Sequence, residues 1–275
     1  MNIIEIGEAP YTFVFLHGLF GQGRNWTTIA KNLLPASSLL VDLPNHGRSE
    51  WTDHFSYESM ADSVASLLST LPHPVCLVGH SMGGRVAMMT ALTHPEHIDR
   101  LVVEDTSPTN LSMDEFISYA HAMSSIDPSQ LTSRTQARHL LAESVPDPRI
   151  LGFLLQNLQP DETGHWHWLP NLALLERDMG QIGLWPHIGT HFDKPVLWIT
   201  GATSTRTSPA DLSAMRTLFP LTRQYRVKSA GHWVHADAPD IFVAALRSFI
   251  FTGAKQSMLI SAPMKSSKYR SNIIR

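Results

Sequence analysis

Residues Gly79–Gly83 read GHSMG, and they stand between an apolar run and a helical pattern. The run Pro74–Val78 (PVCLV) predicts a buried strand, and Arg85–Leu92 (RVAMMTAL) has the spacing of a helix. A strand that turns so tightly into a helix needs residues without side chains near the turn, and the two glycines provide them. We therefore expect Ser81 at a strained backbone angle, with its hydroxyl exposed at the start of the helix, where it can act as a nucleophile.

Composition and charge exclude several classes of protein. The chain has 275 residues, of which 43% are hydrophobic, which is enough for a sizeable core. A net charge of −3 argues against a general nucleic-acid binder or a protein that binds anionic membranes. No apolar run approaches the ~20 residues that span a bilayer, and the N-terminus does not resemble a signal peptide. We expect a soluble, cytoplasmic protein with no membrane span and no nucleic-acid partner.

Short apolar runs alternate with amphipathic stretches in the first hundred residues and again near the end of the chain. This alternation predicts βαβ units and a mostly parallel central sheet flanked by helices, which is an α/β fold. The expected strands are Tyr11–Leu16, Ser38–Asp42, Pro74–Gly79, Arg100–Glu104, Lys194–Thr200 and Arg223–Val227. The expected helices are Trp26–Leu34, Tyr57–Leu71, Gly84–Thr93, Ser208–Phe219 and Pro239–Phe251.

The pattern changes between residues 108 and 186, where helix candidates follow one another without a convincing strand. They are Met113–Met123, Arg134–Ser144, Pro148–Leu158 and Leu169–Met179. An all-helical block inserted into an α/β chain is typical of a cap over the edge of the sheet. We expect a core of residues 1–107 and 187–252, a helical cap of residues 108–186, and a basic, flexible tail of residues 253–275.

A nucleophilic serine needs a histidine base, an acid that orients this base, and donors for the oxyanion. The segment Ser229–His235 (SAGHWVH) follows a strand-like run and precedes the last helix. This position predicts that His232 lies in a loop at the edge of the sheet and serves as the base. We expect His235 to be a wall or hydrogen-bonding residue of the same site.

The oxyanion is stabilised by backbone N–H groups, so the signal in the sequence is a loop rather than a side chain. Phe15–Gly21 (FLHGLFG) ends the first core strand in a turn of this kind. We expect the N–H groups of Leu19 and Met82 to be the donors, with Phe20 as the alternative donor. Phe20 is also expected to form a wall of the pocket.

Four motifs, in this order, resemble those of the α/β-hydrolase superfamily: HGLFG, DLPNHGRS, GHSMGG and GHWVHAD. Together they are most similar to those of the bacterial YbfF-type esterases, and the resemblance covers residues 11–251. It implies an α/β-hydrolase fold and a serine hydrolase that cleaves esters of small or medium acyl groups, with acyl thioesters as an open alternative. HExxH, Walker-type and G-x-G-x-x-G motifs do not occur in the sequence, so we expect neither a metal nor a cofactor.

Two carboxylates compete for the role of the acid. In most α/β-hydrolases it follows the strand that ends here at Gly201, but the next five residues, ATSTR, include no carboxylate. Asp211, the first to follow, is typical of the first turn of a helix. Asp105 stands at the tip of the preceding strand, and YbfF-type esterases are similar in placing their acid there. We expect Asp105 to be the acid and keep Asp211 as the alternative.

The substrate pocket is the least determined part of the site. We expect an apolar pocket for a small-molecule ester or thioester, lined by Phe20, Trp166, Trp168 and Trp185. Two other functions stay open: a lyase that uses the same triad as a base and resembles the menaquinone-pathway synthase MenH, and a non-catalytic receptor built on the same fold. The oligomeric state also stays open.

Overall fold

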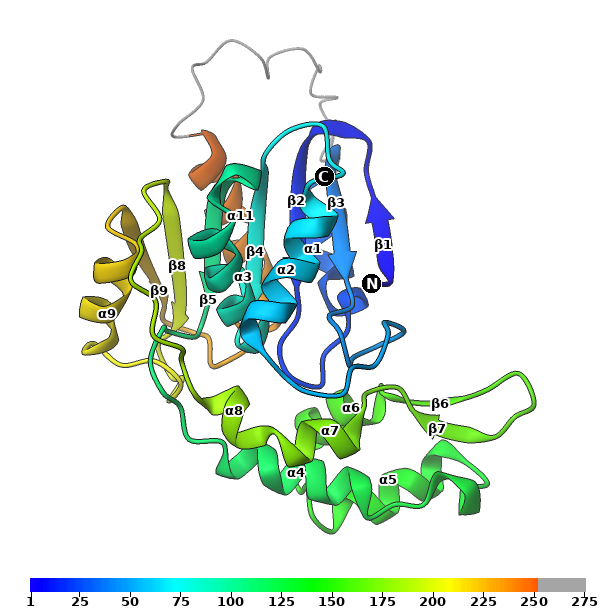
Figure 1. The fold of residues 1–275 in the computed structure, drawn as a ribbon. Coiled ribbons are helices and arrows are strands. Elements are labelled where there is room, and N and C mark those ends of the chain that lie inside the picture. The colour runs from blue at the N-terminus through cyan, green and yellow to red at the C-terminus, as the bar shows by residue number, and fades with distance from the viewer. Residues whose placement is uncertain (252–275) are drawn as a thin grey trace, which may run out of the picture.

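The computed structural model describes residues 1–251, and the predicted basic tail at 253–275 lies outside the described residues. A seven-stranded sheet forms the centre, in the order β1-β3-β2-β4-β5-β8-β9 (Figure 1). Neighbouring strands are parallel except for β1 and β3. The strands are β1 (Ile3–Ile6), β2 (Ala9–Leu16), β3 (Ala36–Val41), β4 (Val75–His80), β5 (Ile98–Glu104), β8 (Val196–Gly201) and β9 (Thr222–Val227).

Side chains of the central strands alternate between two hydrophobic cores. In β2, Val14 and Leu16 belong to one core, whereas Phe13 and Phe15 belong to the other. A strand buried on both faces has a continuous apolar sequence, which is why these runs could be recognised. The first core is covered by α2 (Tyr57–Leu68), α3 (Met82–Thr93) and α9 (Asp211–Leu218). The second is covered by α1 (Thr27–Asn32) and α11 (Pro239–Phe251).

All six predicted strands are present, with their ends within two residues of the predicted ends. The α/β-hydrolase fold expected from the resemblance is therefore confirmed. The edge strand β1 was not predicted, because four residues with half-exposed side chains form no long apolar run. Among the described residues, no helix is both long and apolar enough to cross a membrane.

The segment between β5 and β8 lies along the carboxyl edge of the sheet, below it in the view of Figure 1. Its helices are α4 (Asp114–Ser124), α5 (Arg134–Ala142), α6 (Pro148–Leu155), α7 (Leu172–Arg177) and α8 (Met179–Gly183). A hairpin joins α6 to α7, with β6 (Leu158–Pro160) antiparallel to β7 (Trp166–Trp168). The prediction that this segment is all-helical is wrong in this respect.

The turn of the hairpin explains why a helix does not form there. The Asp161 carboxylate accepts hydrogen bonds from the backbone N–H groups of Thr163 and His165, and Gly164 has a φ of +88°. These local bonds compete with helical ones. Each strand of the hairpin has three residues, too few for an alternating pattern to be recognised in the sequence.

Candidate active site

Ser81 lies in the turn from β4 to α3, with φ 52° and ψ −120°. Residues other than glycine rarely adopt this conformation, and such strain is concentrated at functional sites. Close packing explains the flanking glycines: a Cβ on Gly79 would lie 2.2 Å from the Gly83 carbonyl oxygen, and one on Gly83 would lie 2.3 Å from the His17 carbonyl oxygen. The contacts around the predicted tight turn therefore require glycine at both of these positions.

His232 and Asp105 come from the loops that follow β9 and β5, and they meet beside this turn. The His232 Nδ1 atom lies 2.8 Å from Asp105 Oδ2. The Asp105 side chain is fully buried and the His232 side chain is 14% exposed. Asp105 has a φ of 49°, so it is a second non-glycine residue in the left-handed region at this edge. Since Nδ1 is bonded to Asp105, Nε2 is the ring atom left for a second partner.

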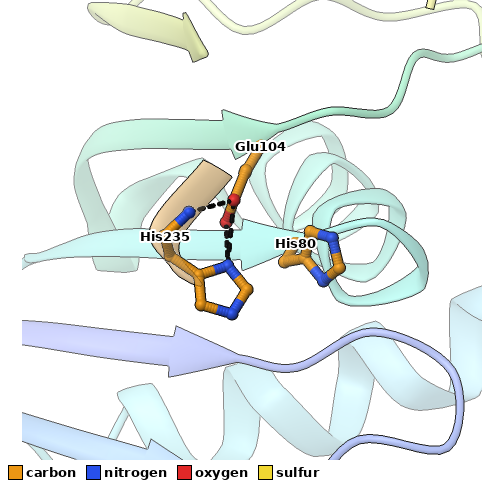
Figure 2. A group of neighbouring side chains, drawn as sticks. All are labelled: His80, Glu104 and His235. Atoms are coloured by element: carbon orange, nitrogen blue, oxygen red, sulfur yellow. Dashed lines mark hydrogen bonds and ion pairs between the residues drawn. The ribbon is translucent and has the colours of Figure 1, made fainter. Parts of the chain in front are cut away.

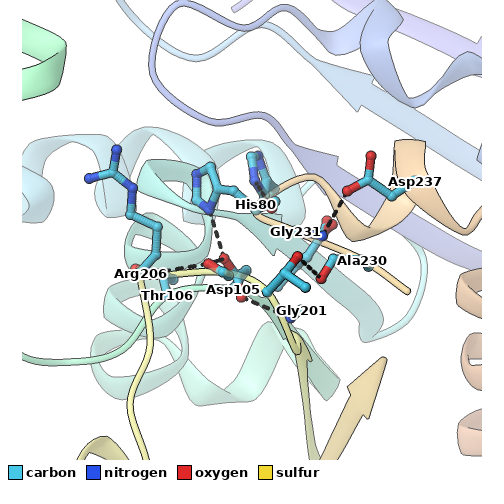
Figure 3. Close-up of polar contacts among 12 residues, drawn as sticks. His80, Asp105, Thr106, Gly201, Arg206, Ala230, Gly231 and Asp237 are labelled. Atoms are coloured by element: carbon cyan, nitrogen blue, oxygen red, sulfur yellow. Dashed lines mark hydrogen bonds and ion pairs between the residues drawn. The ribbon is translucent and has the colours of Figure 1, made fainter. Parts of the chain in front are cut away.

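Two further donors hold the Asp105 carboxylate in place (Figure 3). The Gly201 N–H donates to Oδ1 at 3.0 Å, and the Ser204 hydroxyl donates to Oδ2 at 2.5 Å. With His232, these bonds fix the orientation of the carboxylate. We did not predict a role for Ser204, although it lies in the loop after Gly201 where the acid is usually found.

Asp211 lies elsewhere, at the first turn of α9, as its sequence context indicated. Its carboxylate accepts hydrogen bonds from the N–H and hydroxyl groups of Ser208 and from the Thr109 hydroxyl. Within residues 1–251 it makes no hydrogen bond to His232. The structure thus brings Asp105, and not Asp211, to the histidine.

The loop that carries His232 is held from two sides. Asp237 accepts a hydrogen bond from the Gly231 N–H at 2.8 Å (Figure 3), and its other oxygen accepts one from Arg149 of α6 at 2.5 Å. On the opposite side, His80 Nε2 donates to the His232 carbonyl oxygen at 3.0 Å. Burial, together with the nearby histidines, keeps the pKa of His80 well below its usual value. His80 is therefore neutral at pH 7 and adds no positive charge beside His232.

Glu104 and His235 form a buried pair next to His80 (Figure 2). The Glu104 carboxylate accepts hydrogen bonds from the backbone N–H of His235 at 2.8 Å and from its Nδ1 atom at 2.9 Å. The three residues offer potential metal-ligand atoms that lie within 4.8 Å of one another. His235 forms hydrogen bonds with both Glu104 oxygens, so the carboxylate already has partners and holds the loop in place. We therefore assign no metal to this cluster.

The turn after β2 is braced by His17. Its Nε2 atom accepts a hydrogen bond from the Leu43 N–H at 3.0 Å, so Nδ1 carries the proton and donates to the Gly18 carbonyl oxygen at 2.8 Å. Leu19 and Phe20 follow in this turn and line the same cavity as Ser81. Met82, the other predicted oxyanion donor, is the first residue of α3.

A cavity of about 180 Å³ lies beside Ser81 and His232. Phe20 lines it, whereas the other three aromatic residues that we predicted there do not. Trp168 is only 9% exposed and belongs to the first core. Trp166 packs against Arg134 and Trp185 against Arg85, with the guanidinium carbons 5.7 Å and 5.5 Å from the ring centroids. Trp166 and Trp185 therefore stack on arginine side chains and Trp168 packs in the core, so none of the three lines the cavity.

Other aromatic residues form the wall that we had assigned to the tryptophans. They are Phe116 and Tyr119 of α4, Phe153 of α6, and Trp233 beside the histidine. Phe116 and Tyr119 are three residues apart and therefore share a face of their helix, which is the one signal in the sequence that could have identified them.

Three buried histidines predict that the protein loses stability in acid. Burial lowers the pKa values of His17 and His80, and it lowers that of His46 to about 3. In the unfolded chain each titrates near ~6.5. Below that pH the unfolded state therefore binds protons that the folded state does not, and stability falls as the pH falls. We expect the free energy of unfolding to decrease from pH 6.5 downward by up to ~1.4 kcal/mol per pH unit for each histidine.

Urea denaturation at pH 7.5, 6.5 and 5.5, followed by tryptophan fluorescence, measures this effect. His46→Gln should reduce the slope, whereas His165→Gln, at a side chain that is 79% exposed, should leave it unchanged. An unfolding free energy that is equal at pH 7.5 and 5.5 would contradict the assignment of neutral buried histidines.

Comparison with known proteins agrees with the fold. Residues 13–245 match the model of the alpha/beta hydrolase family. The chain is 37% identical to the mouse sn-1-specific diacylglycerol lipase ABHD11, covering 90% of this chain and 84% of that protein. It is 29% identical to the esterase YbfF of Escherichia coli, covering 86% and 92%. A solved structure, a marine microorganism esterase, matches with a TM-score of 0.87 and 30% identity over 90% and 98% of the two chains.

The chain therefore belongs to the alpha/beta hydrolase family. The relatives are named as esterases and lipases, and the predicted similarity to YbfF is confirmed. The protein is accordingly a hydrolase of the esterase type.

Proposed function

We propose that the protein hydrolyses carboxylic esters of small or medium acyl groups through an acyl-enzyme on Ser81, with acyl thioesters as an alternative substrate. The observation that carries this proposal is the cavity that Ser81 shares with a histidine whose Nδ1 is bonded to a buried carboxylate. The left-handed backbone of both Ser81 and Asp105 supports it, because such strain persists where the surrounding structure holds a residue for function.

In the proposed mechanism, His232 Nε2 takes the proton of Ser81 while Oγ attacks the acyl carbonyl carbon. The N–H groups of Leu19 and Met82 stabilise the oxyanion, with Phe20 as the alternative donor. His232 then gives its proton to the leaving alcohol or thiol and activates the water molecule that releases the acid. Asp105 fixes the tautomer of His232 and stabilises its charged form, and Ser204 keeps Asp105 in position.

The size of the cavity supports a small substrate. Residues 108–186, which we propose as the cap, contribute Phe116, Tyr119 and Phe153 to its wall. The cavity of about 180 Å³ is smaller than drug-sized ligand pockets, which typically begin at roughly 300 Å³. Short acyl esters are therefore favoured over the diacylglycerols named for the mouse relative.

Labelling with a fluorophosphonate, combined with an ester panel, tests the proposal. The wild-type protein should be labelled at Ser81, and kcat/KM should be about tenfold or more higher for p-nitrophenyl butyrate than for p-nitrophenyl laurate, because the cavity rejects the longer chain. Ser81→Ala is the control for the labelling site. Labelling without ester hydrolysis would instead favour the lyase or a receptor, and a protein that is not labelled would contradict a competent nucleophile.

A further inference from the structure

Arg85 is a buried cation without a counter-ion among the described residues. It lies on α3 and is 1% exposed, yet Nε, Nη1 and Nη2 have no hydrogen-bond partner within the described residues. No carboxylate forms an ion pair with it in residues 1–251. Its guanidinium packs against Tyr57 and Trp185, 5.1 Å and 5.5 Å from the ring centroids. Burial lowers the pKa of Arg85, and the nearby Tyr57 hydroxyl opposes this shift. The two rings also favour the positive charge, but they supply no anion, and none of the guanidinium nitrogens meets an acceptor at hydrogen-bond geometry.

A second unpartnered group faces the same space. A small cavity of about 20 Å³ is lined by Arg85 and by Thr106, whose hydroxyl is also buried without a hydrogen-bond partner. Buried polar groups in folded proteins are almost always paired, and an unpaired charge is costly. Two orphaned donors at one cavity therefore indicate a missing acceptor. The Asp105 carboxylate also lines this cavity but is already bonded to Gly201, Ser204 and His232, so the charge of Arg85 favours a further anion as the acceptor.

The small cavity adjoins the reacting atoms. Ser81 and His232 line both this cavity and the larger one. The Arg85 N–H donates to the Ser81 carbonyl oxygen at 3.1 Å, so the two residues stand one helical turn apart on the same face of α3. An anionic group bound at Arg85 and a carbonyl group at Ser81 could therefore belong to one substrate molecule, with only a few covalent bonds between them.

We propose that Arg85 and Thr106 bind a carboxylate at the far end of the substrate's acyl group. The preferred substrates are then half-esters or half-thioesters of short dicarboxylic acids. This inference rests on the proposed function of Ser81. A cavity of about 20 Å³ admits only a small group, which favours a planar carboxylate over a phosphate, and the rest of the substrate occupies the larger cavity. The planar guanidinium suits a carboxylate because it can donate two parallel hydrogen bonds.

Arg206 provides a matched control, because it also lines both cavities but is already paired. Its guanidinium donates to the Glu115 carboxylate and lies 4.6 Å from the centroid of the Phe116 ring. A cation that already has a counter-charge gains little from a second anion. Substituting Arg206 should therefore leave the preference for anionic esters unchanged.

The test compares kcat/KM for monoethyl succinate with that for ethyl isocaproate, in which an isopropyl group replaces the carboxylate. The wild-type protein should prefer the anionic ester. Arg85→Met should lower the ratio of the two values about 10–100-fold, the effect of losing hydrogen bonds to a charged group. Arg85→Lys should keep most of the preference, and Arg206→Met should keep the ratio within about threefold.

Two further measurements separate this inference from the proposed function. Calorimetric titration of Ser81→Ala with monoethyl succinate reports binding without catalysis, and adding Arg85→Met should abolish it. The melting temperature of Arg85→Met should equal or exceed that of the wild type, since the substitution removes an unpaired buried charge. Should this variant fail to fold, Arg85→Lys decides through its retained preference.

If the wild type hydrolyses both esters but Arg85→Met leaves their ratio unchanged, the inference is overturned and the proposed function stands. If neither ester is hydrolysed but monoethyl succinate binds in a manner that requires Arg85, the carboxylate site stands and the proposed function fails. The absence of both binding and preference overturns the inference.

Discussion

Ser81→Ala is expected to lower kcat for p-nitrophenyl butyrate by about 10⁶-fold, the loss seen when a nucleophilic serine is removed from a serine protease. The hydroxyl oxygen, Oγ, is the only side-chain atom of Ser81 that can form the acyl-enzyme. What remains after its removal is the much weaker stabilisation by the oxyanion donors. The measurement is initial-rate kinetics on purified protein, with the melting temperature as a check that the variant is folded.

Ser204→Ala is the appropriate control for this experiment. Ser204 lines the same cavity as Ser81, but it contacts the acid rather than the acyl group in the proposed mechanism. Its loss removes one of three donors to Asp105 and should cost far less than the loss of Ser81, about tenfold. If Ser81→Ala retained a tenth of the wild-type rate, Ser81 could not be the nucleophile.

Asp105→Asn is expected to lower kcat by about 10⁴-fold, by analogy with the same change in serine proteases. The carboxylate oxygen that accepts from Ser204 also lies 2.8 Å from His232 Nδ1. An amide in this position can donate a hydrogen bond from its NH₂ group to Nδ1. This bond stabilises the tautomer in which Nε2 carries the proton, and in that tautomer Nε2 cannot act as a base. The volume of the side chain barely changes, so the loss would report on chemistry rather than packing.

Asp211→Asn is the matched control, because it makes the same chemical change in the alternative acid. Asp211 bonds to Ser208 and Thr109, so kcat should stay within about threefold of the wild-type value. A large loss in Asp211→Asn together with a small one in Asp105→Asn would transfer the role of the acid to Asp211.

Much of the fold and of the candidate site could be predicted because the signals are local. A side chain on Gly79 would clash with Gly83, four residues further along the chain, and one on Gly83 would clash with the end of the adjoining strand β2. The central strands are continuous apolar runs because both of their faces are buried. In a parallel sheet the carboxyl ends of the strands share one edge, so residues that follow β4, β5 and β9 were expected to meet there.

The walls of the cavity could not be predicted in the same way. Trp166, Trp168 and Trp185 are as apolar as Phe116 and Phe153, and composition does not say which of them face the substrate. The answer depends on how α4, α6 and the hairpin pack, which involves contacts between segments far apart in the chain. The hairpin itself was missed because its strands are too short to carry a pattern.

The nucleophile turn, the positions of six strands along the chain and the loops that carry Ser81 and His232 could be predicted from the sequence, with Asp105 preferred over Asp211 as the acid. Steric requirements between neighbouring residues and the burial of whole strands leave a direct trace in the order of amino acids. The burial of Arg85 beside Ser81 without a counter-charge, in contrast, depends on how segments far apart in the chain pack together. An arginine in a helix is ordinary in a sequence, and its lack of a partner becomes visible only when every segment packed around it is in place.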